Sequence, residues 1–137
     1  CVIGLTCCPG SEIDRAADVG ISPDPGPEVI TGSTRMKCGT AQKMVLNMLS
    51  TCTMVKLGKV YGNLMVDVKP SNEKLVHRCI SIVREATGAD EKTAVAALEA
   101  CGYKCKTAIV MLLCSVSADE AEARLGRSDG RVADAIR

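Results

Sequence analysis

Short apolar runs and helically spaced apolar positions occupy different parts of this chain. Residues 2–6 and 19–22 are short apolar runs that predict buried strands, and a turn of helix beginning at Ser11 between them fits a parallel crossover. Residues 41–55 then carry apolar side chains at three- and four-residue spacing, which predicts a helix with one apolar face that ends at Gly58. The first part of the chain therefore reads as a layered α/β region.

From about residue 71 onward, the apolar residues recur only at the three- and four-residue spacing typical of helices. Capping residues and glycines divide this part into successive predicted helices. These helices run from Ser71 or Asn72 to Gly88, from Asp90 to Gly102, over 106–114, from a capping box at Ser117 to near Gly126, and over 129–136. The pattern predicts a mostly helical chain with two domains, residues 1–70 with a parallel sheet and flanking helices, and residues 71–137 with helices only.

Residues 26–40 concentrate hydroxyls, cations and glycines directly before the first long predicted helix. Free backbone N–H groups at a helix start can hold phosphate oxygens, and the hydroxyls of Ser33 and Thr34 can donate to the same oxygens. Arg35 and Lys37 can neutralise the phosphate charge. We therefore expect these four side chains to bind an anionic substrate.

Glu28 is the one carboxylate in this stretch, and a phosphate nearby would repel it. Its expected role is therefore to accept hydrogen bonds from neutral hydroxyls or to move a proton. Three prolines in the preceding loop, residues 22–27, restrict the backbone and reduce the entropy lost when the loop holds its functional residues. Two plainer readings remain open: the stretch is an ordinary cap and turn, and Glu28 caps the amides of its own loop.

The same residues resemble a known family. Residues 26–40, continued by the run Leu57 to Val68, closely resemble the N-acetylmuramic acid 6-phosphate etherases, which share this signature with the glucokinase regulatory protein. The resemblance extends upstream to Ile3 through Pro9, where Cys8 stands in place of an asparagine, and downstream to the end of the chain. It implies the C-terminal part of a sugar isomerase (SIS) domain followed by a helical domain. Because family members are longer and residue 1 opens directly into a strand, we expect this chain to be a C-terminal portion.

The resemblance also implies a reaction. The family cleaves the D-lactyl ether of N-acetylmuramic acid 6-phosphate in cell-wall recycling and gives N-acetylglucosamine 6-phosphate and D-lactate, without a metal or nucleotide cofactor. The elimination needs an acid and a base, which in the family are glutamates carried by upstream motifs that this chain lacks. The residues expected to bind the phosphosugar are Glu28, Ser33, Thr34, Arg35 and Lys37, with Glu28 as a possible accessory in catalysis. SIS relatives also imply a homodimer.

Two other functions stay open at this point. A phosphosugar-sensing regulator would use the same phosphate-binding loop without catalysis, and a helical interaction module would use the second domain alone. Residues 87–109 resemble the ubiquitin-associated (UBA-like) three-helix module. For that module we expect a small bundle packed on the sugar domain or a dimer mate, with ubiquitin-type binding as the alternative.

The composition argues against nucleic-acid binding, membrane insertion and export. The net charge is +1 and there is no Phe or Trp, which argues against a nucleic-acid surface. The sequence has no long apolar run and no signal-peptide pattern, so neither a membrane span nor export is indicated.

Nine cysteines occur without any C-x-x-C pair, and His77 is the only histidine, so a zinc site is not expected. An odd number of cysteines without an export signal predicts free thiols in the reducing cytoplasm. We expect Cys52 and Cys79 to be small core residues and His77 to be exposed. Cys38 is expected to serve packing rather than nucleophilic attack, and a turn could bring Cys101 and Cys105 close enough to oxidise.

Overall fold

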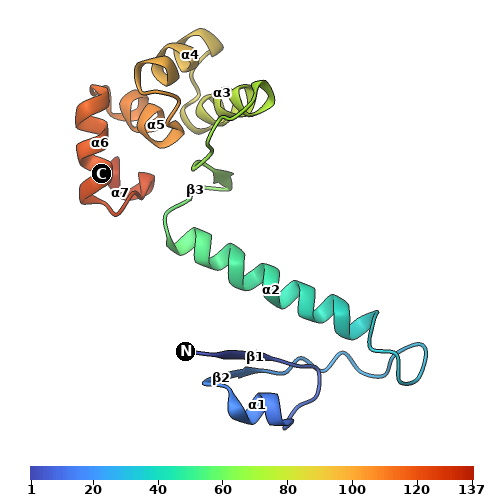
Figure 1. Cartoon of the computed structure of the whole chain (residues 1–137). Coiled ribbons are helices and arrows are strands. Elements are labelled where there is room, and N and C mark those ends of the chain that lie inside the picture. Colours follow the sequence, from blue (N-terminus) through green and yellow to red (C-terminus); the bar gives the residue numbers. More distant parts are fainter. The chain divides into compact units, whose positions relative to one another are not determined.

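The computed structural model describes residues 1–137, which form two compact units, residues 1–52 and 53–137 (Figure 1). The division falls within the longest helix, α2 (Lys37–Lys56), and thus before the boundary at residue 70 expected from the sequence. Most of the chain is helical, as expected. None of the helices combines the length and the apolar character needed to cross a membrane.

The first unit opens with a parallel pair of short strands, as predicted, but the expected burial is absent, since Gly4 is the only buried residue of the two strands. Strands β1 (Ile3–Leu5) and β2 (Val19–Ile21) pair in register and are connected by helix α1 (Glu12–Ala16). The hydroxyl of Ser11 caps α1 by accepting the Asp14 amide at 3.4 Å. A Cβ on Gly4 would come within 2.8 Å of the Ala17 Cβ, so glycine lets α1 lie directly against the sheet.

Helix α2 confirms the long predicted helix and begins at Lys37, ahead of the apolar stripe. No residue of α2 is buried, and Cys52, which we expected in a core, is exposed. That expectation was wrong because a helical stripe predicts which face is apolar, whereas burial also requires an opposing surface.

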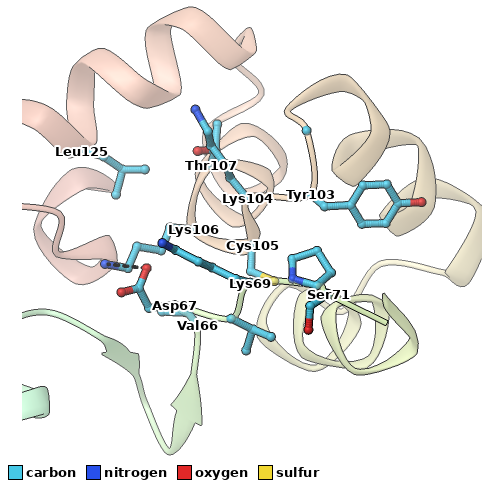
Figure 2. Close-up of a pocket in the computed structure, with 13 residues that line it drawn as sticks. Val66, Asp67, Lys69, Ser71, Tyr103, Lys104, Cys105, Lys106, Thr107 and Leu125 are labelled. Atoms are coloured by element: carbon cyan, nitrogen blue, oxygen red, sulfur yellow. Dashed lines mark ion pairs between the residues drawn. The ribbon is translucent and has the colours of Figure 1, made fainter. Parts of the chain in front are cut away.

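A hairpin that the sequence analysis missed opens the second unit. Strands β3 (Val60–Tyr61) and β4 (Leu64–Met65) pair antiparallel around the dipeptide Gly62-Asn63. Two short apolar runs separated by such a dipeptide are typical of a tight hairpin, and Gly62 has the positive φ (58°) that this turn requires. Residues 66–71, which follow β4, lie beside the start of helix α5 (Cys105–Cys114), and Val66 and Val68 pack into the helical core (Figure 2).

The remaining helices confirm the predicted pattern. Asn72, Asp90 and Ser117 each accept an amide hydrogen bond as N-caps of the helices that follow them, and Gly88 ends the first of these helices at a φ of 73°. The helices are α3 (Glu73–Thr87), α4 (Glu91–Ala100), α5, α6 (Ala118–Arg127) and the short α7 (Val132–Ala135).

The end of α2 is attached to the helical unit through Arg131. Its guanidinium donates a hydrogen bond of 3.0 Å to the Lys56 carbonyl. Gly58 follows with a φ of 67°, and a Cβ there would come within 2.8 Å of the Arg131 side chain. Glycine is therefore required at this position both for its backbone conformation and for the close approach of Arg131.

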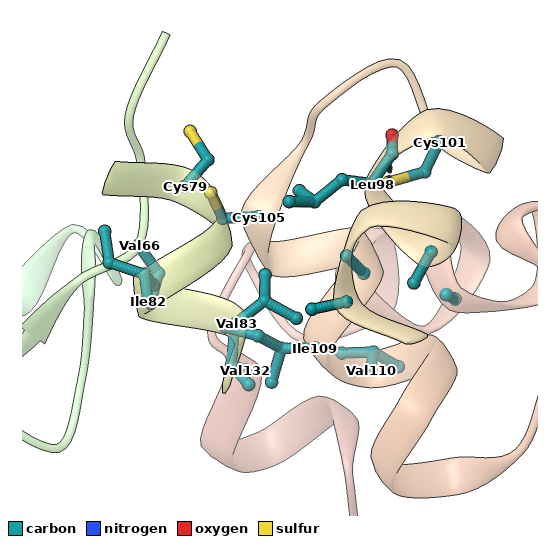
Figure 3. Close-up of a cluster of buried hydrophobic side chains, with 14 of the residues drawn as sticks. Val66, Cys79, Ile82, Val83, Leu98, Cys101, Cys105, Ile109, Val110 and Val132 are labelled. Atoms are coloured by element: carbon teal, nitrogen blue, oxygen red, sulfur yellow. Dashed lines mark hydrogen bonds between the residues drawn. The ribbon is translucent and has the colours of Figure 1, made fainter. Parts of the chain in front are cut away.

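The hydrophobic core lies entirely within the second unit (Figure 3). Its largest fully buried side chains come from the segment after β4 and from helices α3, α4, α5 and α7: Val66, Cys79, Val83, Leu98, Cys105, Ile109, Val110 and Val132. The predictions that Cys79 is buried and His77 exposed are confirmed. Cys101 and Cys105 are both buried, and all nine cysteines are free thiols.

Candidate functional site

Glu28 is bound to the start of α2. Its two carboxylate oxygens accept the amides of Lys37 and Cys38, each at 3.1 Å. The hydrogen bonds from Cys38 and then Lys37 hold the pKa of the Glu28 carboxyl below its ordinary value. The loop from residue 28 to the helix is thereby closed on itself.

This geometry corrects one expectation about the anion site. We expected free amides at the helix start to receive phosphate, but the Glu28 carboxylate occupies the amides of Lys37 and Cys38. The alternative, in which Glu28 caps amides of its own loop, is the arrangement that the structure shows. A carboxylate is favoured there because the N-terminus of a helix carries a partial positive charge.

The other predicted site residues lie inside the closed loop or at its end. The Ser33 amide donates to the Ile30 carbonyl at 3.0 Å, which folds the loop into a turn. Thr34, Arg35 and Lys37 are exposed, and neither cation takes part in an ion pair. Two hydroxyls and two unpaired cations thus remain available to an anionic ligand.

Thr34 also borders a small hollow at the end of β1. The hollow measures about 250 Å³ and is lined by Thr6, Cys7, Cys8, Thr34, Cys38 and Gln42. Thr6 and Gln42 were not expected from the sequence to be site residues. The signal that could have found them is general: ligands of parallel α/β proteins bind at the carboxyl ends of the strands, where Thr6 follows β1.

Three cysteines line this hollow, Cys7, Cys8 and Cys38. The Cys7 thiol lies 3.7 Å from the Cys38 carbonyl oxygen. Burial raises the pKa of the Cys38 thiol, and the neighbouring Cys7 and Glu28 raise that pKa further. A thiol that stays protonated is a weak nucleophile, which agrees with a packing role for Cys38.

The arrangement suits binding better than proton transfer. Glu28 is the only carboxylate expected at the site, and its lowered pKa keeps it ionised at neutral pH. An ionised carboxylate that already accepts two amides cannot act as a general acid. The loop therefore offers hydrogen-bond donors and positive charge for an anionic ligand.

Comparison with known proteins gives these residues a context. Residues 62–107 match the family described as the C-terminal lid domain of glucokinase regulatory protein. Over 132 residues, 96% of this chain, the sequence is 55% identical to an N-acetylmuramic acid 6-phosphate etherase of Klebsiella aerogenes, of which it covers 44%. It is 54% identical over 134 residues to the etherase of Escherichia coli O1:K1 / APEC, and 53% identical over 135 residues to N-acetylmuramic acid 6-phosphate etherase 1 of Vibrio cholerae.

These matches confirm the resemblance seen in the sequence. They cover 98% of this chain in the latter two relatives, but only 45% of each relative. The chain thus spans less than half the length of the curated relatives that it matches. Over nearly its entire length, the chain is therefore similar in sequence to the C-terminal parts of proteins named N-acetylmuramic acid 6-phosphate etherase.

Proposed function

We propose that this chain is the C-terminal portion of an N-acetylmuramic acid 6-phosphate etherase. Such an enzyme is a carbon–oxygen lyase that gives N-acetylglucosamine 6-phosphate and D-lactate in cell-wall amino-sugar recycling. The observation that carries the proposal is the 55% identity over 132 residues to a relative of that name. In this proposal the protein is a cytoplasmic homodimer with a SIS domain, and residues 71–137 form a UBA-like bundle that packs on it.

The proposed reaction requires groups that this chain does not supply. A base removes the C2 proton, an acid protonates the departing lactate oxygen, and water then adds to the unsaturated sugar. Glu28 is held ionised by two amides and is a poor acid. We place the acid and the base in the part of the enzyme that precedes these residues.

The proposed task of this chain is to hold the phosphosugar. Ser33 and Thr34 donate hydrogen bonds to the phosphate, and Arg35 and Lys37 offset its charge. Each Glu28 oxygen accepts only one amide and keeps lone-pair capacity that can accept a sugar hydroxyl. Glu28 thereby fixes the loop and orients the sugar at the same time.

A chimeric enzyme tests the proposal. This chain replaces the aligned segment of the Klebsiella aerogenes etherase, and D-lactate release from N-acetylmuramic acid 6-phosphate is measured. The same etherase lacking the segment serves as the control, and the 137-residue chain alone should release no lactate. A folded chimera that binds the phosphosugar but releases no lactate would contradict the enzymatic proposal.

Substitutions in the chimera test the loop. Lys37→Met removes a charged hydrogen bond to phosphate and should raise KM about tenfold or more with a smaller effect on kcat. Lys43→Met is the matched control, because Lys43 is another exposed lysine of α2 and lies outside the loop. Equal KM values for the two variants would show that Lys37 does not bind the phosphate.

A second candidate is a phosphosugar-sensing regulator. It is favoured by one observation, the match of residues 62–107 to the lid domain of glucokinase regulatory protein. The chimera separates the two functions, because a sensor is stabilised by the sugar phosphate in a melting experiment without turning it over.

A further inference from the structure

A second concave site lies in the helical unit, away from the Glu28 loop in sequence. It measures about 420 Å³ and lies between residues 66–71 and the start of α5 (Figure 2). That volume is within the range of small-molecule pockets. Apolar side chains form much of its lining: Val66, Val68, Pro70, Cys105 and Leu125.

Lysines surround this pocket and exceed the carboxylates in number. Lys104 pairs with Glu122 at 2.6 Å, and Lys106 lies 3.8 Å from Asp67. Lys69 also lines the pocket and forms no ion pair. Figure 2 shows its ammonium group extending from residues 66–71 on the side of the pocket that holds Asp67.

The Asp67 carboxylate does not cancel this positive charge. The main cause is the hydrogen bond that Asp67 accepts from the Lys59 ammonium, which holds the pKa of Asp67 below its ordinary value. The positive charges of Lys106 and Lys69 lower this pKa further. One ionised carboxylate therefore faces several lysines. The surroundings of the pocket keep a surplus of positive charge.

The start of α5 adds hydrogen-bond donors. No side chain caps this ten-residue helix, and Lys104 occupies the N-cap position without a capping hydrogen bond. The first amides of a helix have no partners within it, and here Cys105, Lys106 and Thr107 all line the pocket. This end of the helix therefore favours an anion.

Thr107 adds a hydroxyl to the lining of the pocket. The residue is only 2% exposed, yet its hydroxyl forms no hydrogen bond within the protein and it lines the pocket. The hydroxyl oxygen itself is open to the pocket, since the only fully buried side-chain oxygen or nitrogen without a partner is the Ser22 Oγ, and it can therefore donate to a bound anion.

We propose that this pocket binds a small organic anion, in which a carboxylate or phosphate group is joined to an apolar body. The anionic group meets the first amides of α5, the Thr107 hydroxyl and the Lys69 ammonium. The apolar body lies against Val66 and Leu125. The site is separate from the Glu28 loop, and its test does not depend on the etherase activity.

Amide NMR of the 137-residue chain tests the site with three probes of equal carbon length: hexanoate, hexyl phosphate and 1-hexanol. At least one anion should saturate the pocket, shift the amides of Cys105, Lys106 and Thr107, and bind about tenfold more tightly than the neutral alcohol. Comparison of the two anions identifies the preferred group.

Two variants assign the contacts. Lys69→Met and Thr107→Val should each weaken binding of the preferred anion several-fold, and the valine retains the shape of the buried threonine. Lys92→Met is the matched control, because Lys92 is exposed on α4 outside the pocket and should leave the affinity unchanged. Equal binding of 1-hexanol and the anions, absence of saturable anion binding, or unchanged affinity in both pocket variants would overturn the proposal.

Discussion

Residues 1–52 and residues 53–137 both carry regular apolar patterns, but only the second unit buries them. Every buried hydrophobic side chain lies between Val66 and Ala135. In the first unit only Gly4 and Thr6 are buried, while Ile3, Val19 and the apolar residues of α2 remain exposed or half-buried. This difference shows that an apolar pattern determines where a helix or strand forms and which of its faces is apolar. Whether that face is buried depends on the surface that lies opposite it.

The two units also differ in how their elements support each other. In the second unit, four helices of ten or more residues share one core with the segment after β4. The first unit has a two-stranded parallel sheet, and parallel sheets are normally larger and covered on both faces. In the proposed complete enzyme, the remaining part of the SIS domain covers this sheet and α2.

The largest expected effect comes from the same substitution made in both units. Leu98→Ala empties a site that is 0% exposed and should lower the free energy of unfolding by about 2–5 kcal/mol. Leu46→Ala, at a site 58% exposed on α2, should change it by less than about 0.5 kcal/mol. Urea denaturation of the two variants measures both effects.

The etherase chimera extends this comparison. If the rest of the enzyme covers α2, Leu46→Ala should destabilise the chimera more than it destabilises the 137-residue chain. Equal losses from Leu46→Ala and Leu98→Ala in the isolated chain would show that α2 is packed in solution, and the contrast between the units would fail.

A smaller effect is expected from the helix caps. Asn72 caps α3 through the Leu75 amide at 3.0 Å, and α3 contributes Cys79 and Val83 to the core. Asn72→Ala should therefore lower the free energy of unfolding by about 1 kcal/mol. Ser11→Ala removes the corresponding cap of α1, which has no buried residue, and should leave the main unfolding transition unchanged. A shift of that transition by Ser11→Ala would show that the two units unfold together.

The helices could be predicted from the sequence because their signals are local. Caps such as Asn72, Asp90 and Ser117 fix where helices begin, and the glycine at position 88 ends one of them in the expected conformation. The hairpin was missed because its strands are only two residues long, although the Gly62-Asn63 dipeptide marks it. The exposure of Cys52 could not be predicted, because it depends on surfaces distant in sequence.

The residues of the loop before α2 could be predicted as a candidate site from the sequence, but their hydrogen bonds could not. Charge and hydroxyl content singled out the loop before α2, and sequence reasoning left open whether its carboxylate faces a ligand or its own amides. That choice depends on the path of the chain, which brings Glu28 back to Lys37 and Cys38. The pocket beside α5 was not foreseen for the same reason, since its walls come from residues 66–71, 102–107 and 125.

The last and smallest expected effect is local and depends on pH. Because hydrogen bonds lower the pKa of Glu28 in the folded chain, its carboxylate stabilises the start of α2 above the ordinary glutamate pKa. This contribution is lost as the pH falls through the lowered pKa. Protection of the Lys37 and Cys38 amides against hydrogen exchange, corrected for intrinsic rates, should fall as the pH is lowered from the ordinary glutamate pKa through the range of the lowered pKa. Glu28→Gln should give low protection across that range.

Asp90 supplies the matching measurement in the second unit. Its carboxylate caps α4 through the Thr93 amide at 2.9 Å, and that hydrogen bond holds its pKa below the ordinary value as well. Acid should therefore weaken this cap too. Helix α4, however, buries Ala94 and Leu98 in the core, so its later amides should stay protected when the cap is lost. If the amides of α2 and α4 lost protection to the same extent, core packing would not be what distinguishes the two units.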